Sequence, residues 1–292
     1  MSNFSRAAAR FGYVQSTVSV QIAALEEDLG IRLIDRLGRT IALTAAGQAL
    51  LPYAEHLLEL AAEARSAAVA AVADDIALTG TVTVSAPESL LTYRLPTTLS
   101  RFRAGHPGVS IDLRPTPIGR FRGDTRQAIA SGAVDLAFVL DAALRLPGFC
   151  AEVLRAEPIS VVVPVGHHLA RLSIVEASDL AADVILLPEA PESGCAYRRQ
   201  FERQLCGAGI SLDGALEFAS IETVKQCVIA GMGVAVLPTV AIQTDVTAGR
   251  LATLAWRETF DVSTQMIWNE RRWISPAQAA FMAVARTVIR EP

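Results

Sequence analysis

Apolar positions near the start of the chain follow a helical period. From Gln15 to Leu29 the apolar residues recur every three or four positions, which predicts an amphipathic helix that ends before Gly30. Residues 4–11 predict a shorter helix, and Gly12 supplies its stop. Two helices joined by a turn of three or four residues form a helix-turn-helix candidate.

The next apolar runs are too short for helices. Residues 31–36 and 41–44 flank a basic turn that contains Gly38 and Arg39. This pattern is typical of a small β-hairpin, which in this position would be the wing of a winged helix-turn-helix. We therefore expect a DNA-binding domain over residues 1–45.

An alanine- and leucine-rich stretch predicts one long helix from Thr44 to about Ala73, with Pro52 tolerated in its first turns. Its apolar stripe is wider than a lone exposed helix needs, so a second copy of the chain is expected to cover it. Packing of the stripe against the chain's own globular part stays open as the alternative. We take residues 46–74 as a linker and dimerisation helix.

From Gly80 onward strand-like runs alternate with amphipathic runs. This alternation predicts parallel sheets with helices on both faces. The predicted strands are 81–85, 109–113, 134–140, 159–163, 184–187, 216–219, 234–237 and 262–268, and the predicted helices are 91–104, 120–131, 195–205, 221–230 and 276–289.

Length and charge limit the classes of protein. A chain of 292 residues exceeds a typical domain, so two or three compact units are expected. The net charge of −4 argues against a uniformly basic nucleic-acid binder, and residues 1–50 carry a net charge of only +1. The longest uncharged apolar stretch, residues 228–242, is shorter than the ~20 residues that cross a bilayer. With no signal-peptide pattern at the start, we expect a cytoplasmic protein without a membrane partner.

Candidate catalytic chemistry is weak. The histidines have no neighbouring nucleophile motif, and the glycines at 231 and 233 lack dinucleotide-fingerprint spacing. The cysteines show no metal spacing, so we expect no catalytic residue, no cofactor and no metal. A solute-binding protein is the remaining alternative, because its two-lobed domain would show the same alternation. The residues weighed are His56, His106, His167, His168, Cys150, Cys195, Cys206 and Cys227.

Several motifs along the chain belong together: residues 4–8, 15–22, 25–30, 33–36 and 43–47 near the N-terminus, and residues 95–96, 102–107, 132–137 and 230–238 later. In this combination they resemble the LysR-type family of transcriptional regulators. The resemblance covers essentially the whole chain. It implies an α+β protein with an N-terminal winged helix-turn-helix, a long linker helix and a C-terminal two-lobed α/β domain like periplasmic binding proteins. Lobe I is expected over 80–156 and 266–292, and lobe II over 157–265.

The resemblance implies a sequence-specific regulator that binds double-stranded DNA and is controlled by a small-molecule effector. A helix that enters the major groove reads bases with its first turns, while wing arginines reach phosphates. Each of these residues has an ordinary alternative as a helix cap or a solvated charge. The candidate DNA-binding residues are Gln15, Ser16, Thr17, Ser19, Gln21, Arg32, Arg36, Arg39 and Thr44.

The effector is expected between the two lobes, where loops and helix N-termini face each other. Glu88 and Glu222 would repel an anion unless they are paired, so a neutral or cationic effector stays open. Turns and caps without a ligand role are the alternative at each position. The candidate effector-binding residues are Pro87, Glu88, Ser89, Thr116, Pro117, Ile118, Phe138, Pro188, Glu189, Ile221 and Glu222.

The resemblance also implies self-association into a dimer or tetramer and leaves RNA polymerase open as a partner. Three departures stand against it: the family has about 15–20 residues before Phe4, a hydroxyl residue at Val14 and a basic residue at Val20. We therefore expect Met1 not to be the natural start and the first helix to be truncated.

Cys195 and Cys206 match a region where peroxide-sensing members carry cysteines. Eleven helical residues hold two groups roughly 16 Å apart, so a redox role is the weaker alternative to buried thiols.

Overall fold

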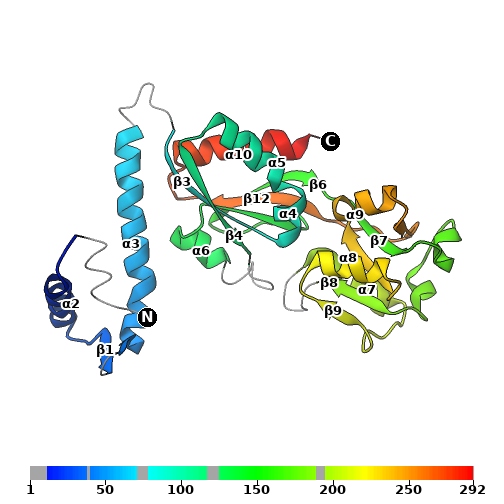
Figure 1. The fold of residues 1–292 in the computed structure, drawn as a ribbon, viewed down its shortest axis with the longest axis horizontal. Helices are drawn as coiled ribbons and strands as arrows, with labels where there is room; N and C mark the ends of the chain where they lie inside the picture. Colours follow the sequence, from blue (N-terminus) through cyan, green and yellow to red (C-terminus); the bar gives the residue numbers. More distant parts are fainter. Residues whose placement is uncertain (1–11, 38–39, 71–77, 117–124, 189–194, 292) are drawn as a thin grey trace. The chain divides into compact units, whose positions relative to one another are not determined.

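The computed structural model describes residues 12–37, 40–70, 78–116, 125–188 and 195–291. The chain divides into two compact units, Met1–Arg65 and Ser66–Pro292. The predicted helix over residues 4–11 lies outside the described residues. Figure 1 labels the elements of both units.

The first unit contains the elements that the hydrophobic pattern predicts. Helix α2 spans Gln15–Leu29, and strands β1 (Ile34–Leu37) and β2 (Thr40–Leu43) form an antiparallel hairpin in which Ile34 pairs with Leu43. Helix α3 follows over Ala45–Ala70 and contains Pro52. The predicted reading helix, wing and long helix are confirmed in order and type.

Local contacts of Glu26, Thr44 and Gly47 join α2, the wing and the start of α3. Glu26 of α2 accepts hydrogen bonds from the backbone amides of Leu33 (2.7 Å) and Ile34 (3.0 Å) through one carboxylate oxygen. Thr44 donates to the carbonyl of Arg32 at 2.7 Å and accepts from the amide of Gly47 at 3.0 Å. Gly47 packs so closely that an added Cβ would lie 2.1 Å from the Leu33 carbonyl oxygen. These contacts set the angle between reading helix and wing.

The second unit consists of two lobes, each with a five-stranded sheet. Lobe I has the strand order β4-β3-β5-β12-β6, in which β3 pairs in parallel with β4 and β5 while β12 runs antiparallel to β5 and β6. Its strands are β3 (Gly80–Ala86), β4 (Val109–Pro115), β5 (Leu136–Asp141), β6 (Phe149–Ala156) and β12 (Ser263–Asn269).

Helices cover both faces of the lobe I sheet. Helices α5 (Leu95–Gly105) and α10 (Pro276–Arg290) lie side by side on one face, and α6 (Arg126–Ser131) lies on the other (Figure 1). The side chains of β5 alternate between the two faces: Phe138 is in the core under α10, whereas Val139 is in the core under α6. A short helix, α4 (Glu88–Tyr93), follows β3.

Lobe II has the strand order β11-β7-β10-β8-β9. Strands β8 and β9 are parallel to β10, whereas β7 and β11 supply antiparallel pairs at the other side. Its strands are β7 (Ile159–Pro164), β8 (Ile185–Pro188), β9 (Leu216–Phe218), β10 (Val234–Pro238) and β11 (Leu251–Thr253), and its helices are α7 (Ala196–Gly207), α8 (Ile221–Ile229) and α9 (Thr239–Thr247), with 3-10 turns η2 (His168–Arg171) and η3 (Ala177–Leu180).

The sequence pattern was wrong on several details of this unit. Both sheets are mixed rather than parallel, because returning strands β12 and β7 run against their neighbours. Strands β6 and β11 and helix α9 were not predicted, and the predicted helix over 91–104 is two helices that meet at Arg94. Strand β12 joins the lobe I sheet from Ser263, three residues before the expected boundary.

Candidate DNA-binding and effector sites

The first turns of α2 present polar side chains to the surface. Gln15, Ser16 and Gln21 are exposed, and Thr17 and Ser19 are half-buried. Val14 occupies the N-cap position in extended conformation and provides no side-chain cap, as its apolar side chain predicts. No described residue of α2 is buried, so its whole length is open on at least one side.

The candidate residues of the wing fall into two groups. Arg32 is exposed and precedes β1, whereas Arg36 lies in β1 opposite Ile41. The side chain of Arg36 and the whole of Arg39 lie outside the described residues. Thr44 differs from the others, because its hydroxyl is engaged with the Arg32 carbonyl and the Gly47 amide. The structure therefore gives Thr44 a capping contact, which is the ordinary alternative named for it above.

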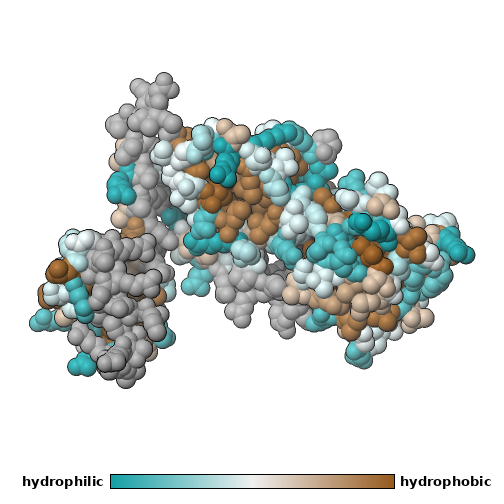
Figure 2. All heavy atoms as spheres, viewed as in Figure 1, coloured by the Kyte–Doolittle hydropathy of each residue, from teal (hydrophilic) through white to brown (hydrophobic). Residues whose placement is uncertain are grey.

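Helix α3 carries a run of exposed apolar side chains. Leu57, Leu58 and Tyr53 are 65%, 74% and 70% exposed, and Leu51 and Leu60 are also exposed. Isolated exposed apolar residues are common, but several on one helix indicate a contact surface. In Figure 2 hydrophobic residues also stand out on the visible face of the two-lobed unit, among a majority of more hydrophilic ones.

On lobe I, the candidate effector residues gather where β3 ends. Pro87 is the N-cap of α4, with its carbonyl accepting from the amides of Leu90 and Leu91 at 3.0 Å. Glu88 is exposed and Ser89 is buried. Thr116 follows β4 and lies 3.1 Å from the Ser85 hydroxyl. Pro117, Ile118 and Glu189 lie outside the described residues.

On lobe II, the candidate residues lie at the end of β8 and the start of α8. Pro188 is buried and its carbonyl accepts from the buried guanidinium of Arg198 at 3.4 Å. Ser220 caps α8, Ile221 is 1% exposed in the core, and Glu222 is exposed. Hydrogen bonds between described residues join α4 of lobe I to the start of α8 in lobe II, while effector binding by the candidate residues stays a prediction.

Hydrogen bonds between described residues join the lobes at this site, including one of 3.4 Å from Lys225 to the Tyr93 hydroxyl. The Ser220 hydroxyl donates to Glu88 at 2.9 Å, and the Tyr93 hydroxyl donates to Glu222 at 2.8 Å. Behind them Lys225 binds Glu222 at 2.8 Å and the buried Asp245 at 3.1 Å. Lys225 and Asp245 were missed from the sequence, because a charged residue on the buried face of a helix has no local signature.

This cluster perturbs its own ionisation. Burial alone would lower the pKa of Lys225, but hydrogen bonds with Glu222, Asp245 and Tyr93 outweigh it, so the pKa is raised. Burial alone would raise the pKa of Glu222, but hydrogen bonds from Lys225, Gln226 and Tyr93 outweigh it, so the pKa is lowered. Burial raises the pKa of Tyr93, and the hydrogen bond to Glu222 raises it further. At neutral pH, Lys225 is therefore held as an ammonium between the carboxylates of Glu222 and Asp245.

Like Ile221, the candidate Phe138 lies away from the surface. Phe138 is 0% exposed and packs edge-on against Phe281 at 6.4 Å between ring centroids. The structure places it in the core of lobe I, since alternation along β5 turns its side chain toward α10. In this position Phe138 has no exposed surface with which to contact an effector.

The two lobes are linked by two chain crossings, and Glu157 lies at the first of them. Its carboxylate is almost fully buried and accepts two hydrogen bonds from Arg94, at 2.6 and 2.9 Å, and one from Thr264 at 2.8 Å. Its amide donates to the carbonyl of Val262 on the second crossing at 2.9 Å. A buried charge with this many partners fixes the place where the lobes join.

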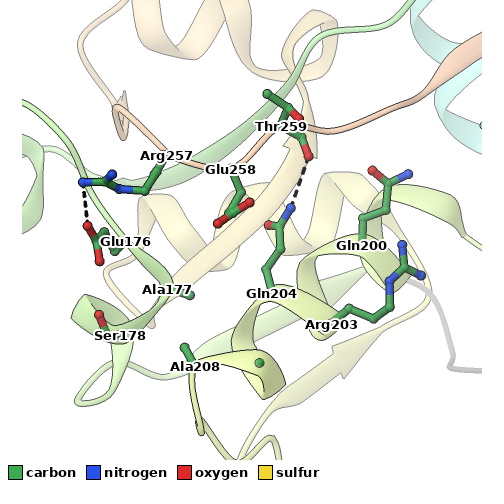
Figure 3. A pocket seen from close by; sticks show the side chains of 11 residues that line it. Glu176, Ala177, Ser178, Gln200, Arg203, Gln204, Ala208, Arg257, Glu258 and Thr259 are labelled. Atoms are coloured by element: carbon green, nitrogen blue, oxygen red, sulfur yellow. Dashed lines mark hydrogen bonds and ion pairs between the residues drawn. The ribbon is translucent and has the colours of Figure 1, made fainter.

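A separate hollow of about 460 Å³ lies on lobe II (Figure 3). It is lined by α7, η3 and the segment after β11. An ion pair of 2.6 Å between Arg257 and Glu176 and a hydrogen bond of 3.2 Å from Gln204 to the Thr259 carbonyl cross its rim. None of the candidate effector residues that the structure describes lines it.

Cys195 and Cys206 lie at opposite ends of α7. Cys195 is buried at the N-cap of the helix, and Cys206 is exposed. The intact helix between them keeps them apart, as the length of the helix predicts.

The geometry defines a class of protein. A reading helix with an exposed polar N-terminus lies beside a hairpin wing, and a second unit has two α/β lobes whose polar side chains meet. These are the parts of a DNA-binding regulator with a ligand-binding domain.

Comparison with known proteins agrees. Residues 1–48 match the bacterial regulatory helix-turn-helix protein of the lysR family, and residues 77–290 match the LysR substrate binding domain. The uncharacterized HTH-type transcriptional regulator YwqM of Bacillus subtilis is 34% identical over 99% of this chain and 94% of its own length. The chain belongs to the LysR family, and it is a DNA-binding transcriptional regulator rather than an enzyme.

Solved structures show the same fold. A full-length OxyR variant from Pseudomonas aeruginosa aligns with a TM-score of 0.70, at 22% identity over 99% of this chain and 90% of that one. Full-length CbnR complexed with its target DNA aligns with a TM-score of 0.66, at 22% identity over 98% of this chain and 94% of that one. Among the described residues, no helix has the length and apolar character needed to cross a membrane.

Proposed function

We propose that this regulator reads its operator with the first turns of α2. Gln15, Ser16 and Thr17 would meet base edges, with Ser19 and Gln21 one turn further along the helix. Arg32, Arg36 and Arg39 would bind phosphates beside the wing. The observation that carries this proposal is the exposed polar N-terminus of α2, held against the wing by Glu26.

Self-association is the second part of the proposal. The exposed leucines of α3 would pack against the same helix of a second chain, giving a dimer and, through further contacts, a tetramer. Paired reading helices impose two-fold symmetry on the DNA site. Light scattering of the full chain at micromolar concentration tests this part, and a monomer would contradict it. Contact with RNA polymerase at the promoter belongs to the same proposal.

The effector would bind where the lobes meet, against Glu88, Ser89, Thr116 and the N-terminus of α8. Two features support this site. Polar side chains from both lobes converge there, and Lys225 neutralises Glu222, whereas Glu88 accepts a hydrogen bond from the uncharged Ser220 hydroxyl. A bound molecule would compete with the Ser220–Glu88 hydrogen bond and so shift the balance between open and closed lobes.

The decisive experiment compares two substitutions against a selected set of DNA duplexes. Gln15→Ala should change which sequences are preferred, because a bidentate amide–adenine pair is worth about 1–3 kcal/mol. Arg36→Ala should weaken all sequences and reduce the salt slope by about one. Equal, sequence-independent losses from both substitutions would show that the assignment of roles is wrong.

A further inference from the structure

Two histidines and a carboxylate meet at a corner of lobe II that the regulatory sites do not use. His167 and His168 follow β7, and Asp183 precedes β8. One ligand atom from each of the three lies within 4.8 Å of the other two. The centroids of the two imidazole rings are 4.5 Å apart and the ring planes are tilted by 33°, so the rings lie against each other.

One polar atom of this corner is left without a partner. The Asp183 Oδ1 atom lies 3.0 Å from His167 Nε2, but its Oδ2 atom is buried and has no hydrogen-bond partner among the described residues. A buried polar atom without a partner costs about 1–3 kcal/mol, and more when it is charged. A bound cation would satisfy it.

We propose that His167, His168 and Asp183 form a binding site for a borderline divalent ion such as Zn²⁺. Two imidazole nitrogens and one carboxylate oxygen are a donor set that such ions prefer. Bonds of about 2.0–2.1 Å to one tetrahedral ion place its ligand atoms roughly 3.3 Å apart. The exposed side chain of His168 has room to close the remaining distance. Water would fill the fourth position.

The proton balance of this site follows from the present contacts. Without metal, His167 Nε2 donates to Asp183, while its Nδ1 accepts from the Leu169 amide at 3.4 Å. An ion at Nε2 requires the ring proton on Nδ1, so the long Leu169 contact is given up. Two metal bonds, to His167 and Asp183, replace the hydrogen bond between these two residues and the contact with Leu169. The rival account is that His167 only caps η2 and ties the loop to Asp183.

Zinc titration of the tag-free full chain separates the two accounts. Calorimetry should show one saturable Zn²⁺ site per chain, and a His168→Ala variant should weaken it by about tenfold or more, because one of three protein ligands is lost. An Arg171→Ala variant changes an exposed neighbour in the same 3-10 turn and should bind within about twofold of the parent chain.

Cobalt provides an independent readout. Co²⁺ bound to nitrogen and oxygen alone gives d–d bands without thiolate charge transfer, and these bands should be lost in His168→Ala. Absence of saturable Zn²⁺ binding, or equal binding by His168→Ala, would overturn the proposal. A thiolate charge-transfer band that disappears in Cys206→Ser would also overturn it, since the ion would then sit on the exposed cysteine.

Discussion

The two units position polar groups in opposite ways. In the first unit, the candidate reading residues of α2 stand at the surface, and contacts between neighbouring segments hold the helix and wing together. In the second unit, Tyr93 of lobe I is half-buried and bonds to the exposed Glu222 and the buried Lys225 of lobe II, more than 100 positions away along the chain. A reading surface therefore depends on short-range geometry, whereas an effector site depends on long-range assembly.

The largest expected effect breaks the short-range geometry. In Gly47→Ala the new Cβ would lie 2.1 Å from the Leu33 carbonyl oxygen, so the backbone between wing and α3 must shift. We expect the first unit to lose about 2–3 kcal/mol of stability and the protein to lose at least tenfold in affinity for duplex DNA. Thermal unfolding and fluorescence anisotropy measure the two effects.

Gly105→Ala is the matched control, because a Cβ at the end of α5 meets nothing within 4 Å. The two-lobed unit should unfold unchanged in Gly47→Ala. An unaltered first transition in that variant would mean that the contact with Leu33 relaxes without cost.

An intermediate effect is expected in the long-range cluster. Asp245 accepts from Lys225 at 3.1 Å and from Arg250 at 2.8 Å, and these bonds outweigh burial to lower its pKa below the ordinary 3.8. Asp245→Asn should destabilise the two-lobed unit by about 1–2 kcal/mol at pH 7.

The sign of the pH dependence follows from the lowered pKa. The contribution of Asp245 is present above its ordinary pKa and is lost as the pH falls through the lowered folded value. The stability difference between parent and variant should therefore be constant near neutrality and shrink below about pH 4. Asp213→Asn, at an exposed site, serves as the control. A difference that grows on acidification would contradict the assignment.

The smallest effect concerns the hydrogen bonds between lobes. Tyr93→Phe removes the 2.8 Å bond to Glu222 and the 3.4 Å contact with Lys225. Because Glu222 is exposed, we expect less than about 1 kcal/mol of lost stability. Hydrogen exchange at the N-terminus of α8 should become faster, while exchange in α10 stays the same. Unchanged exchange at α8 would show that this bond does not hold the lobes together.

Local pattern predicted most elements but not their directions. The apolar residues that predict α2, α3, α8 and α10 each recur within one continuous stretch of sequence, and each helix lies where it was expected. Strand β6 and helix α9 were missed because β6 contains charged residues at Glu152 and Arg155 and α9 has little amphipathic contrast. The direction of β12 depends on how the chain returns to lobe I, which no local pattern records.

The sequence by itself determined the family, the order of the units and the polar character of the reading helix. Those properties lie in contiguous motifs, where spacing and residue type act over one or two helical turns. Only the tertiary structure decided that Phe138 is core, that Thr44 is a cap and that Lys225 lies between Glu222 and Asp245. The reason is physical: burial and ion pairing depend on which distant segments pack together, and the chain encodes that packing through all of its contacts at once.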